Sequence, residues 1–179
     1  MRGGVSPESL ARFMREIGKE ARSPGRVYLV GGSTALLLGI RNQTIDIDIK
    51  LDPEPQGVFE SIARIKEELS LSVELASPDH FLPSLPRWRD RSLWIAAHGQ
   101  VDFYHYDLYS QVLSKILRNH GHDLDDARSF VKMGQLSMAV LLELFEAITP
   151  DLIRYPAINA VEFRRSVAAF IQEQSHAAS

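Results

Sequence analysis

The sequence predicts a mixed α/β fold, in which a small mixed β-sheet with flanking helices is followed by a helical C-terminal segment. Short β-rich runs alternate with amphipathic helical patterns up to about residue 107, and from Leu108 onward only the helical period recurs. The run Ile45–Leu51 alternates strictly between apolar and polar residues, which is the period of a strand. We therefore expect an α/β core over residues 1–107 and a helical segment over 108–179 packed on it.

The composition is that of an ordinary globular domain. The chain has 179 residues, of which 45% are hydrophobic and 24% charged, enough for a full apolar core. The net charge of -3 argues against broad, charge-driven binding to nucleic acid, and the lack of cysteine excludes disulfides and thiolate zinc sites. No signal-peptide core and no membrane-spanning run is present, so we expect a soluble, cytoplasmic protein without a membrane partner.

The first half of the chain contains the elements around which the rest is arranged. Ser6-Pro7-Glu8 begins a helix, with Ser6 as N-cap and Pro7 in the first turn. Val27–Val30 is a buried strand that ends at two glycines, and Ser33–Leu38 is a short buried helix that Gly39 ends. After the strand Ile45–Leu51, apolar residues at helical spacing predict an amphipathic helix over residues 58–69.

The second half begins with a possible strand at Leu71–Leu75. Ser77–Arg91 has three prolines and no period, so we expect a loop there and hypothesise that it is mobile and covers the site. Two strands joined by a tight connection follow, and then four helices. The two strands are expected at Leu93–Ala97 and Val101–Tyr106, and the helices at Leu108–Asn119, Leu124–Met133, Leu136–Ile148 and Ile158–Gln174.

Two aspartates on the strand Ile45–Leu51 are the strongest functional signal. Alternate strand residues share a face, so Thr44, Asp46, Asp48 and Lys50 point one way and the apolar residues, Ile45 included, point into the core. The two carboxylates are then about 7 Å apart along the strand. Asp is depleted in strands, which favours a metal site over a polar face turned to solvent.

A third carboxylate, Asp102, lies between the core residues Val101 and Phe103 on a later strand. If that strand neighbours the Asp46/Asp48 strand, three carboxylates converge; the alternative is a single exposed Asp on an edge strand. Oxygen ligands of this kind suit Mg²⁺, which completes its shell with water and substrate phosphates. Two such ions can support an in-line displacement at phosphorus.

Gly31-Gly32-Ser33 stands where a strand turns into a helix. Glycines let the backbone approach a phosphate closely, the helix start offers free N–H groups, and Ser33 adds a hydroxyl. The spacing is neither that of a P-loop nor that of a dinucleotide-binding fingerprint. A plain strand-to-helix turn is the alternative interpretation of this motif when it is taken alone.

The stretch GGSTALLLGIRNQTIDIDI resembles the signature of the DNA polymerase β-type nucleotidyltransferase superfamily, in which a glycine–serine turn is followed by a spacer, Asp-x-Asp and a later Asp. The pattern Arg41…Thr44-x-Asp46-x-Asp48 is similar to small prokaryotic nucleotidyltransferase-like proteins, including the toxins of type IV toxin–antitoxin pairs. A second match is Lys115 with Arg118, followed by an Asp pair at Asp123–Asp126. Together the matches span about Tyr28–Asp126.

The resemblance implies transfer of a nucleoside monophosphate from an NTP such as ATP to an unknown acceptor, with release of pyrophosphate. It implies two Mg²⁺ ions held by Asp46, Asp48 and Asp102, nucleotide binding by Gly31, Gly32, Ser33, Arg41 and Thr44, and a catalytic Lys115 that faces the nucleotide. RNA, a protein or a small molecule would be the acceptor. Two alternatives stay open: an inactive binding or scaffold protein, and a toxin that modifies tRNA or protein and has a cognate antitoxin.

Without the resemblance, the residues of the second match have plainer roles. Lys115 is then a solvated helix lysine, and Arg118 forms a surface ion pair with Asp123 or Asp126. Asp123, Asp125 and Asp126 would stabilise a helix start through its dipole. The sequence also departs from the relatives at His120-Gly121-His122, where they commonly carry a basic residue.

Overall fold

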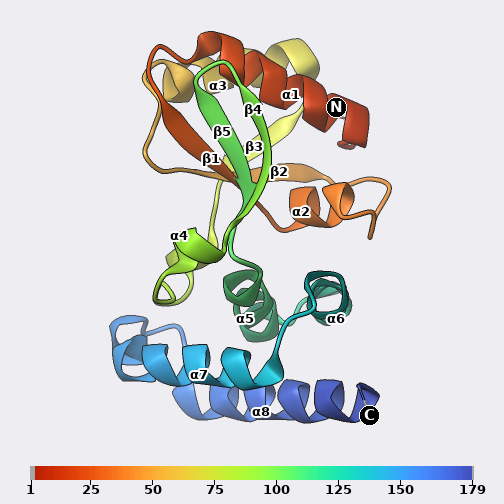
Figure 1. Ribbon diagram of the computed structural model, residues 1–179, viewed down its shortest axis with the longest axis vertical. Coiled ribbons are helices and arrows are strands. Elements are labelled where there is room, and N and C mark those ends of the chain that lie inside the picture. Colours follow the sequence, from red (N-terminus) through yellow and green to blue (C-terminus); the bar gives the residue numbers. More distant parts are fainter. Residues whose placement is uncertain (1–2, 179) are drawn as a thin grey trace. The chain divides into compact units, whose positions relative to one another are not determined.

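The computed structural model describes residues 3–178 (Figure 1). Backbone contacts divide the chain into two compact units. The sheet unit comprises the described residues up to Ser77 together with Ser92–Tyr106, and the helical unit comprises Pro78–Arg91 together with the described residues from Asp107 onward. In this division Pro78–Arg91 and Asp107, which were expected in the α/β core, belong with the helices.

The sheet unit is built on a five-stranded mixed sheet in the order β3-β2-β1-β5-β4. The central strand β1 is antiparallel to β2 and parallel to β5, β2 is parallel to β3, and β4 is antiparallel to β5. This is the small mixed sheet that the sequence predicts. The strand bounds are Gly25–Val30 (β1), Asp46–Leu51 (β2), Ser72–Leu75 (β3), Leu93–His98 (β4) and Val101–His105 (β5).

Three helices belong to the sheet unit: α1 (Pro7–Glu20), α2 (Gly32–Leu37) and α3 (Val58–Leu69). Ser6 begins α1 as predicted, in a reciprocal capping box with Ser9. The apolar stripes of α1 and α3 pack with alternate residues of β1, β2 and β5 in one core, so these two helices cover one face of the sheet (Figure 1). The core includes Phe13, Ile17, Leu29, Ile47, Ile65 and Phe103.

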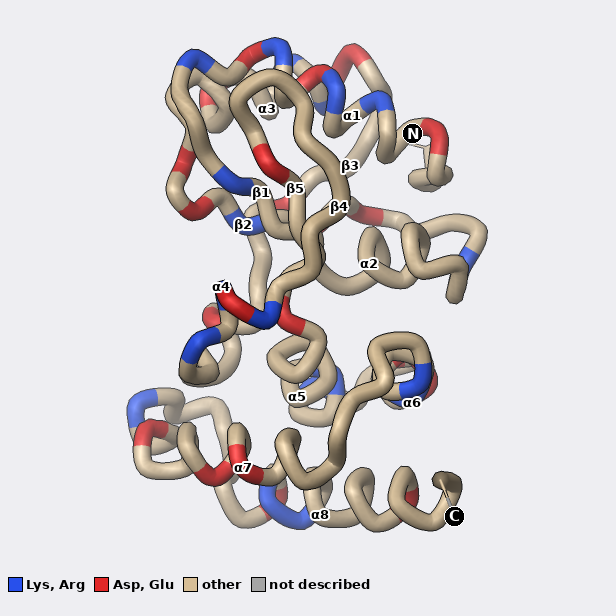
Figure 2. Tube along the Cα trace, in the orientation of Figure 1, with Lys and Arg blue, Asp and Glu red and all other residues tan. Residues whose placement is uncertain are grey.

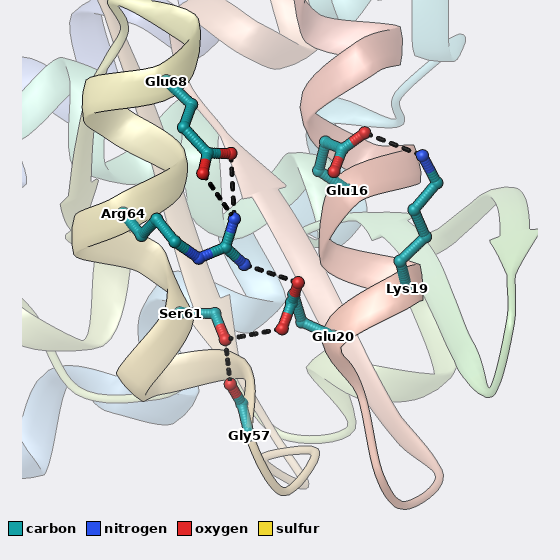
Figure 3. Close-up of polar contacts among 7 residues, drawn as sticks. All are labelled: Glu16, Lys19, Glu20, Gly57, Ser61, Arg64 and Glu68. Atoms are coloured by element: carbon teal, nitrogen blue, oxygen red, sulfur yellow. Dashed lines mark hydrogen bonds and ion pairs between the residues drawn. The ribbon is translucent and has the colours of Figure 1, made fainter.

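The solvent side of α1 and α3 is charged, with acidic and basic residues interspersed (Figure 2). Arg64 on α3 binds Glu68 on its own helix and Glu20 on α1, and Ser61 donates a hydrogen bond to Glu20 (Figure 3). The Arg64 side chain is 47% exposed, and exposed ion pairs contribute little stability. The apolar core therefore holds these helices to the sheet, and the ion pairs align them with each other.

The helical unit contains the four predicted helices and some short turns (Figure 1). The carboxylate of Asp107 accepts hydrogen bonds from the backbone N–H groups of Tyr109 and Ser110 and so caps α5. The helix bounds are Trp88–Arg91 (α4), Leu108–Arg118 (α5), Asp123–Gly134 (α6), Met138–Ile148 (α7) and Ala160–Ala177 (α8), and two 3₁₀ turns span Pro78–His80 and Thr149–Arg154.

The segment expected as a loop, Ser77–Arg91, has a different structure. It contains a 3₁₀ turn and α4, and it buries Leu82, Leu85 and Trp88. Arg91 binds both carboxylate oxygens of Asp107, at 3.1 and 2.8 Å, which ties the segment to the start of α5. Its apolar residues follow neither the helical nor the strand period because most of the segment is irregular backbone. The hydrophobic periodicity of the sequence therefore did not reveal that they are buried.

The prediction that Ile45 points into the core is also wrong, because its side chain is 79% exposed. β2 begins one residue later, at Asp46, and Ile45 lies beyond the part of the sheet that α1 and α3 cover. Ile47 and Ile49 are buried as predicted. No helix in the described part of the chain is long and apolar enough to cross a membrane.

Candidate functional site

The register of β1 and β2 brings Asp48 to the glycine turn. Asp48 lies opposite Val30, the last residue of β1, and Gly31 follows with a positive φ of 64°. A Cβ atom placed on Gly31 would lie 3.6 Å from Oδ2 of Asp48, with no other atom within 4 Å. Glycine suits this position because the backbone is left-handed, and its lack of a side chain leaves the backbone itself next to the carboxylate.

Thr44 packs against the other side of the same turn. A Cβ atom on Gly32 would overlap the Thr44 side chain, so only glycine fits there. The backbone of Thr44 exchanges two hydrogen bonds with Val5, at 2.6 and 3.0 Å, which fix its position outside the end of β2. The structure thus brings Gly31, Gly32, Thr44 and Asp48 close together, and their binding of a nucleotide or metal stays a prediction.

Ser33 follows the turn and is fully buried. Its Oγ atom has no hydrogen-bond partner among the residues that the structure describes. A buried polar group without a partner costs roughly 1–3 kcal/mol, so native structures retain few of them and each needs an explanation. An unsatisfied hydroxyl directly after a glycine turn is consistent with a bound group that supplies the missing contact.

Beneath the turn, a buried hydrogen-bond chain links α2 to β1 and β5. The Thr34 hydroxyl donates to the backbone oxygen of Leu29 (3.2 Å), and Nδ1 of His105 lies 3.1 Å from the same hydroxyl. Because the single hydroxyl hydrogen goes to Leu29, His105 donates through Nδ1. Burial lowers the pKa of His105 to about 4, so the ring is neutral at pH 7. No local pattern could predict this contact, since Thr34 and His105 are 71 residues apart.

Asp46 and Asp48 share one face of β2, and both are half-buried. The parallel neighbour β3 places Glu74 opposite Asp48 and Ser72 opposite Asp46, so Glu74 shares that face about 4.8 Å away in the sheet. Sequence reasoning missed Glu74. The signal was present, because a strand–helix–strand unit predicts that β2 and β3 lie parallel in one sheet, often as neighbours.

Asp102 does not join the other two aspartates, and the expected convergence of three carboxylates is wrong. β1 lies between β2 and β5, and Asp102 is opposite Arg26, whereas Asp48 is opposite Val30. Four residues of β1 separate the two positions, which is about 13 Å along the strand. The Asp102 carboxylate instead accepts a hydrogen bond from the Trp94 ring (3.3 Å).

Arg41, predicted to bind nucleotide, lies in the connection between α2 and β2. Its side chain is half-buried, and its backbone N–H points back to the oxygen of Ala35 (3.4 Å). This connection is part of the sheet unit, like the glycine turn and the aspartates. Its role towards a nucleotide stays a prediction.

Lys115 belongs to the helical unit and is not a solvated lysine, because its side chain is only 10% exposed. Its Nζ lies 3.4 Å from Asp123 and 3.2 Å from Asp126, and 5.6 Å from the centre of the Phe130 ring. Asp123 and Asp126 stand in the first turn of α6 as expected, and Arg118 reaches Asp123 at 3.8 Å. The catalytic role of Lys115 remains what the resemblance implies.

The residues beside the glycine turn fit a divalent cation that binds together with phosphates. The available donors are carboxylate oxygens, Gly31 has no side chain beside Asp48, and the Ser33 hydroxyl lacks a partner within the described residues. Within residues 3–178, no three His, Cys, Asp or Glu side chains are close enough together to hold a metal ion by themselves. A cation at Asp46 and Asp48 would therefore take the rest of its ligands from substrate phosphates and water, as Mg²⁺ does.

The chain has a glycine turn beside an aspartate pair, and both lie on a mixed sheet. We compared the chain with known protein families. A family model described as "Nucleotidyltransferase of unknown function (DUF6036)" matches residues 8–175, which is nearly the whole chain. Comparisons with curated proteins and with solved structures gave no match. The chain belongs to this family of nucleotidyltransferases of unknown function.

Proposed function

We propose that the protein transfers a nucleoside monophosphate from an NTP to an acceptor, with Mg²⁺, and releases pyrophosphate. The observation that carries this proposal is the position of the Asp48 carboxylate directly beside the glycine turn at Gly31. The same turn presents backbone that a phosphate can approach closely, next to a carboxylate pair that can hold the phosphate's counter-ion. Membership of a nucleotidyltransferase family supports the reaction class.

In this proposal Asp46 and Asp48 hold the Mg²⁺ ions. When bound, the ions supply charge neutralisation for the triphosphate and the leaving pyrophosphate. The backbone at Gly31 and Gly32 positions the β- and γ-phosphates, and Ser33 and Thr44 offer hydroxyls beside it. Arg41 contributes positive charge from the connection that follows α2.

The bond changes balance in one displacement. The acceptor oxygen forms a bond to the α-phosphorus, the bond from that phosphorus to the bridging oxygen breaks, and pyrophosphate leaves with the electron pair. The acceptor proton passes to a carboxylate on the Asp48 face of the sheet. Glu74 takes this role in place of Asp102, because the strand register puts Glu74 opposite Asp48.

A second candidate is a protein that binds a nucleotide but does not turn it over. The position of Asp102 favours it, since the later-strand carboxylate that the superfamily signature leads one to expect is about 13 Å along the sheet from the Asp48 position. The two candidates share the Asp46/Asp48 site and differ only in whether a nucleotidyl group is transferred.

The test is incubation of the full chain with each labelled NTP, Mg²⁺ and a total extract of RNA and protein, with label transfer as the readout. We expect Asp46→Asn and Asp48→Asn each to lower transfer by about 10²–10³-fold, the size seen when one stabilising electrostatic contact is removed. Chelation of Mg²⁺ by EDTA should abolish transfer. Asp102→Asn is the matched control, because it removes the same charge from the same face of the sheet.

Calorimetric titration with NTP and Mg²⁺ separates the two candidates. Binding that requires Asp48, without label transfer to any acceptor, would establish the binding protein. Equal transfer by wild type, Asp46→Asn and Asp48→Asn would refute the proposed metal site altogether.

A further inference from the structure

The helical unit contains a pocket of about 570 Å³ that the sequence analysis did not anticipate. It lies between the 3₁₀ turn Pro78–His80, the last turn of α5 and the chain that follows Arg154, so it is formed within the helical unit alone. Its volume is in the range of pockets that bind small ligands, about 300–1,000 Å³. The side chains that matter here are His80, Phe81, Arg118, His120, Arg154 and Tyr155.

The pocket wall contains two arginines and two histidines and no Asp or Glu, although the chain as a whole carries a net charge of -3. Neither arginine is strongly engaged elsewhere. Arg118 lies 3.8 Å from Asp123 and Arg154 lies 4.0 Å from Asp151, both beyond the usual hydrogen-bond range. Both guanidinium groups are therefore available to an anion, and planar guanidinium groups bind phosphate oxygens in pairs.

Aromatic surface lies next to these cations. The guanidinium carbon of Arg118 is 5.9 Å from the centre of the Phe81 ring, and the Phe81 side chain is 42% exposed despite its size. Tyr155 is held in the wall by a hydrogen bond from its hydroxyl to the backbone oxygen of Asp79 (3.5 Å). Leu117, Pro156 and Ile158 complete an apolar floor.

We propose that this pocket binds one nucleotide unit, with the base on the apolar and aromatic surface and the phosphate at Arg118 and Arg154. A planar aromatic ligand that also carries a phosphate matches both halves of the wall, whereas inorganic phosphate or an acidic peptide matches only the basic half. The binding proposal stands on the pocket alone. Its use as the site for a nucleic-acid or nucleotide acceptor rests on the proposed function.

The ligand could be a free nucleotide or one residue of an RNA strand, and the experiment separates these sources. The full chain is titrated calorimetrically, in EDTA, with AMP, with a 5′-phosphorylated six-residue oligoadenylate, with inorganic phosphate and with hexaglutamate. We expect AMP and the oligonucleotide to bind more tightly than phosphate or the peptide. Equal binding of AMP and the oligonucleotide indicates a free nucleotide, and tighter binding of the oligonucleotide indicates a strand.

Variants assign the binding to the pocket. Arg118→Gln/Arg154→Gln should weaken AMP binding by about tenfold or more, because two charge-assisted contacts are lost. Arg15→Gln/Arg165→Gln is the control of equal charge change, since both arginines are exposed and outside the pocket. Phe81→Leu should weaken AMP binding and leave phosphate binding unchanged.

The same titration of Asp46→Asn/Asp48→Asn keeps this proposal apart from the proposed function. AMP binding should survive in that variant even though label transfer is lost. The pocket proposal is overturned if neither AMP nor the oligonucleotide binds the wild type, if hexaglutamate binds as tightly, or if the Arg118/Arg154 variant binds as the control does.

Discussion

Each unit of the protein contains a pair of aspartates that the sequence analysis selected. The two pairs differ in their burial and in their neighbouring side chains. Asp123 and Asp126, in the first turn of α6, are buried and share the ammonium group of Lys115 at 3.4 and 3.2 Å. Asp46 and Asp48, on β2, are half-buried beside a glycine turn. In the described part of the chain, Asp46 has no ion-pair partner.

A residue type alone therefore does not separate a carboxylate paired within the chain from one proposed to bind a ligand. The α6 pair has its cation within the chain, so its charge is largely satisfied. In the proposed function, the β2 pair instead binds the counter-ion of a ligand, as carboxylates bind Mg²⁺ together with phosphates. Substitutions should therefore act on stability in the first pair and on ligand binding in the second.

The largest expected effect on stability is that of Lys115→Met. It removes the cation that two buried carboxylates share, which should lower the free energy of unfolding by about 3–5 kcal/mol. Urea denaturation followed by circular dichroism measures the change. Asp46→Asn is the matched comparison, with a change within about 0.5 kcal/mol. A Lys115→Met protein as stable as wild type would remove the distinction between the two pairs.

A smaller effect should come from His105, below the glycine turn. Its folded-state pKa is about 4 against an ordinary value of 6.5, so the unfolded chain binds the proton more readily between these values. Stability should therefore fall as the pH drops from about 6.5 to 4, by up to about 3 kcal/mol, and be unaffected by this group above pH 7.

The measurement for His105 is urea denaturation across that pH range, comparing wild type with His105→Gln. Removal of the titrating ring should flatten the part of the pH dependence between pH 6.5 and 4, whatever the variant's stability at pH 7. Parallel curves for the two proteins would show that the buried ring does not control acid stability.

The smallest effect should be that of Asp102→Asn, which changes an aspartate that belongs to neither pair. Its carboxylate is half-exposed and accepts a hydrogen bond from the Trp94 ring at 3.3 Å. The unfolding free energy should change by less than about 0.5 kcal/mol and label transfer should stay unchanged. A loss of label transfer as large as that of Asp48→Asn would show that Asp102 contributes to the reaction.

The sequence was sufficient for most of the elements because their signals are local. The N-cap Ser6, the alternation from Ile47 to Leu51 and the helical periods each depend on neighbouring residues, and the structure has these elements within about three residues of the expected bounds. The parity of Asp46 and Asp48 and the glycine turn that precedes them followed from the same local rules.

The contacts between residues that are distant in sequence depend on strand order, register and burial, which are properties of the tertiary structure. Because β1 lies between β2 and β5, Asp102 is far from Asp48, and because β3 pairs with β2, Glu74 is opposite Asp48. No local sequence pattern determines that strand order. The burial of Lys115 and the anchoring of Pro78–Arg91 to α5 likewise depend on contacts between residues distant in sequence. The sequence thus determined which residues share a face, and the pairing of the strands determined which faces meet.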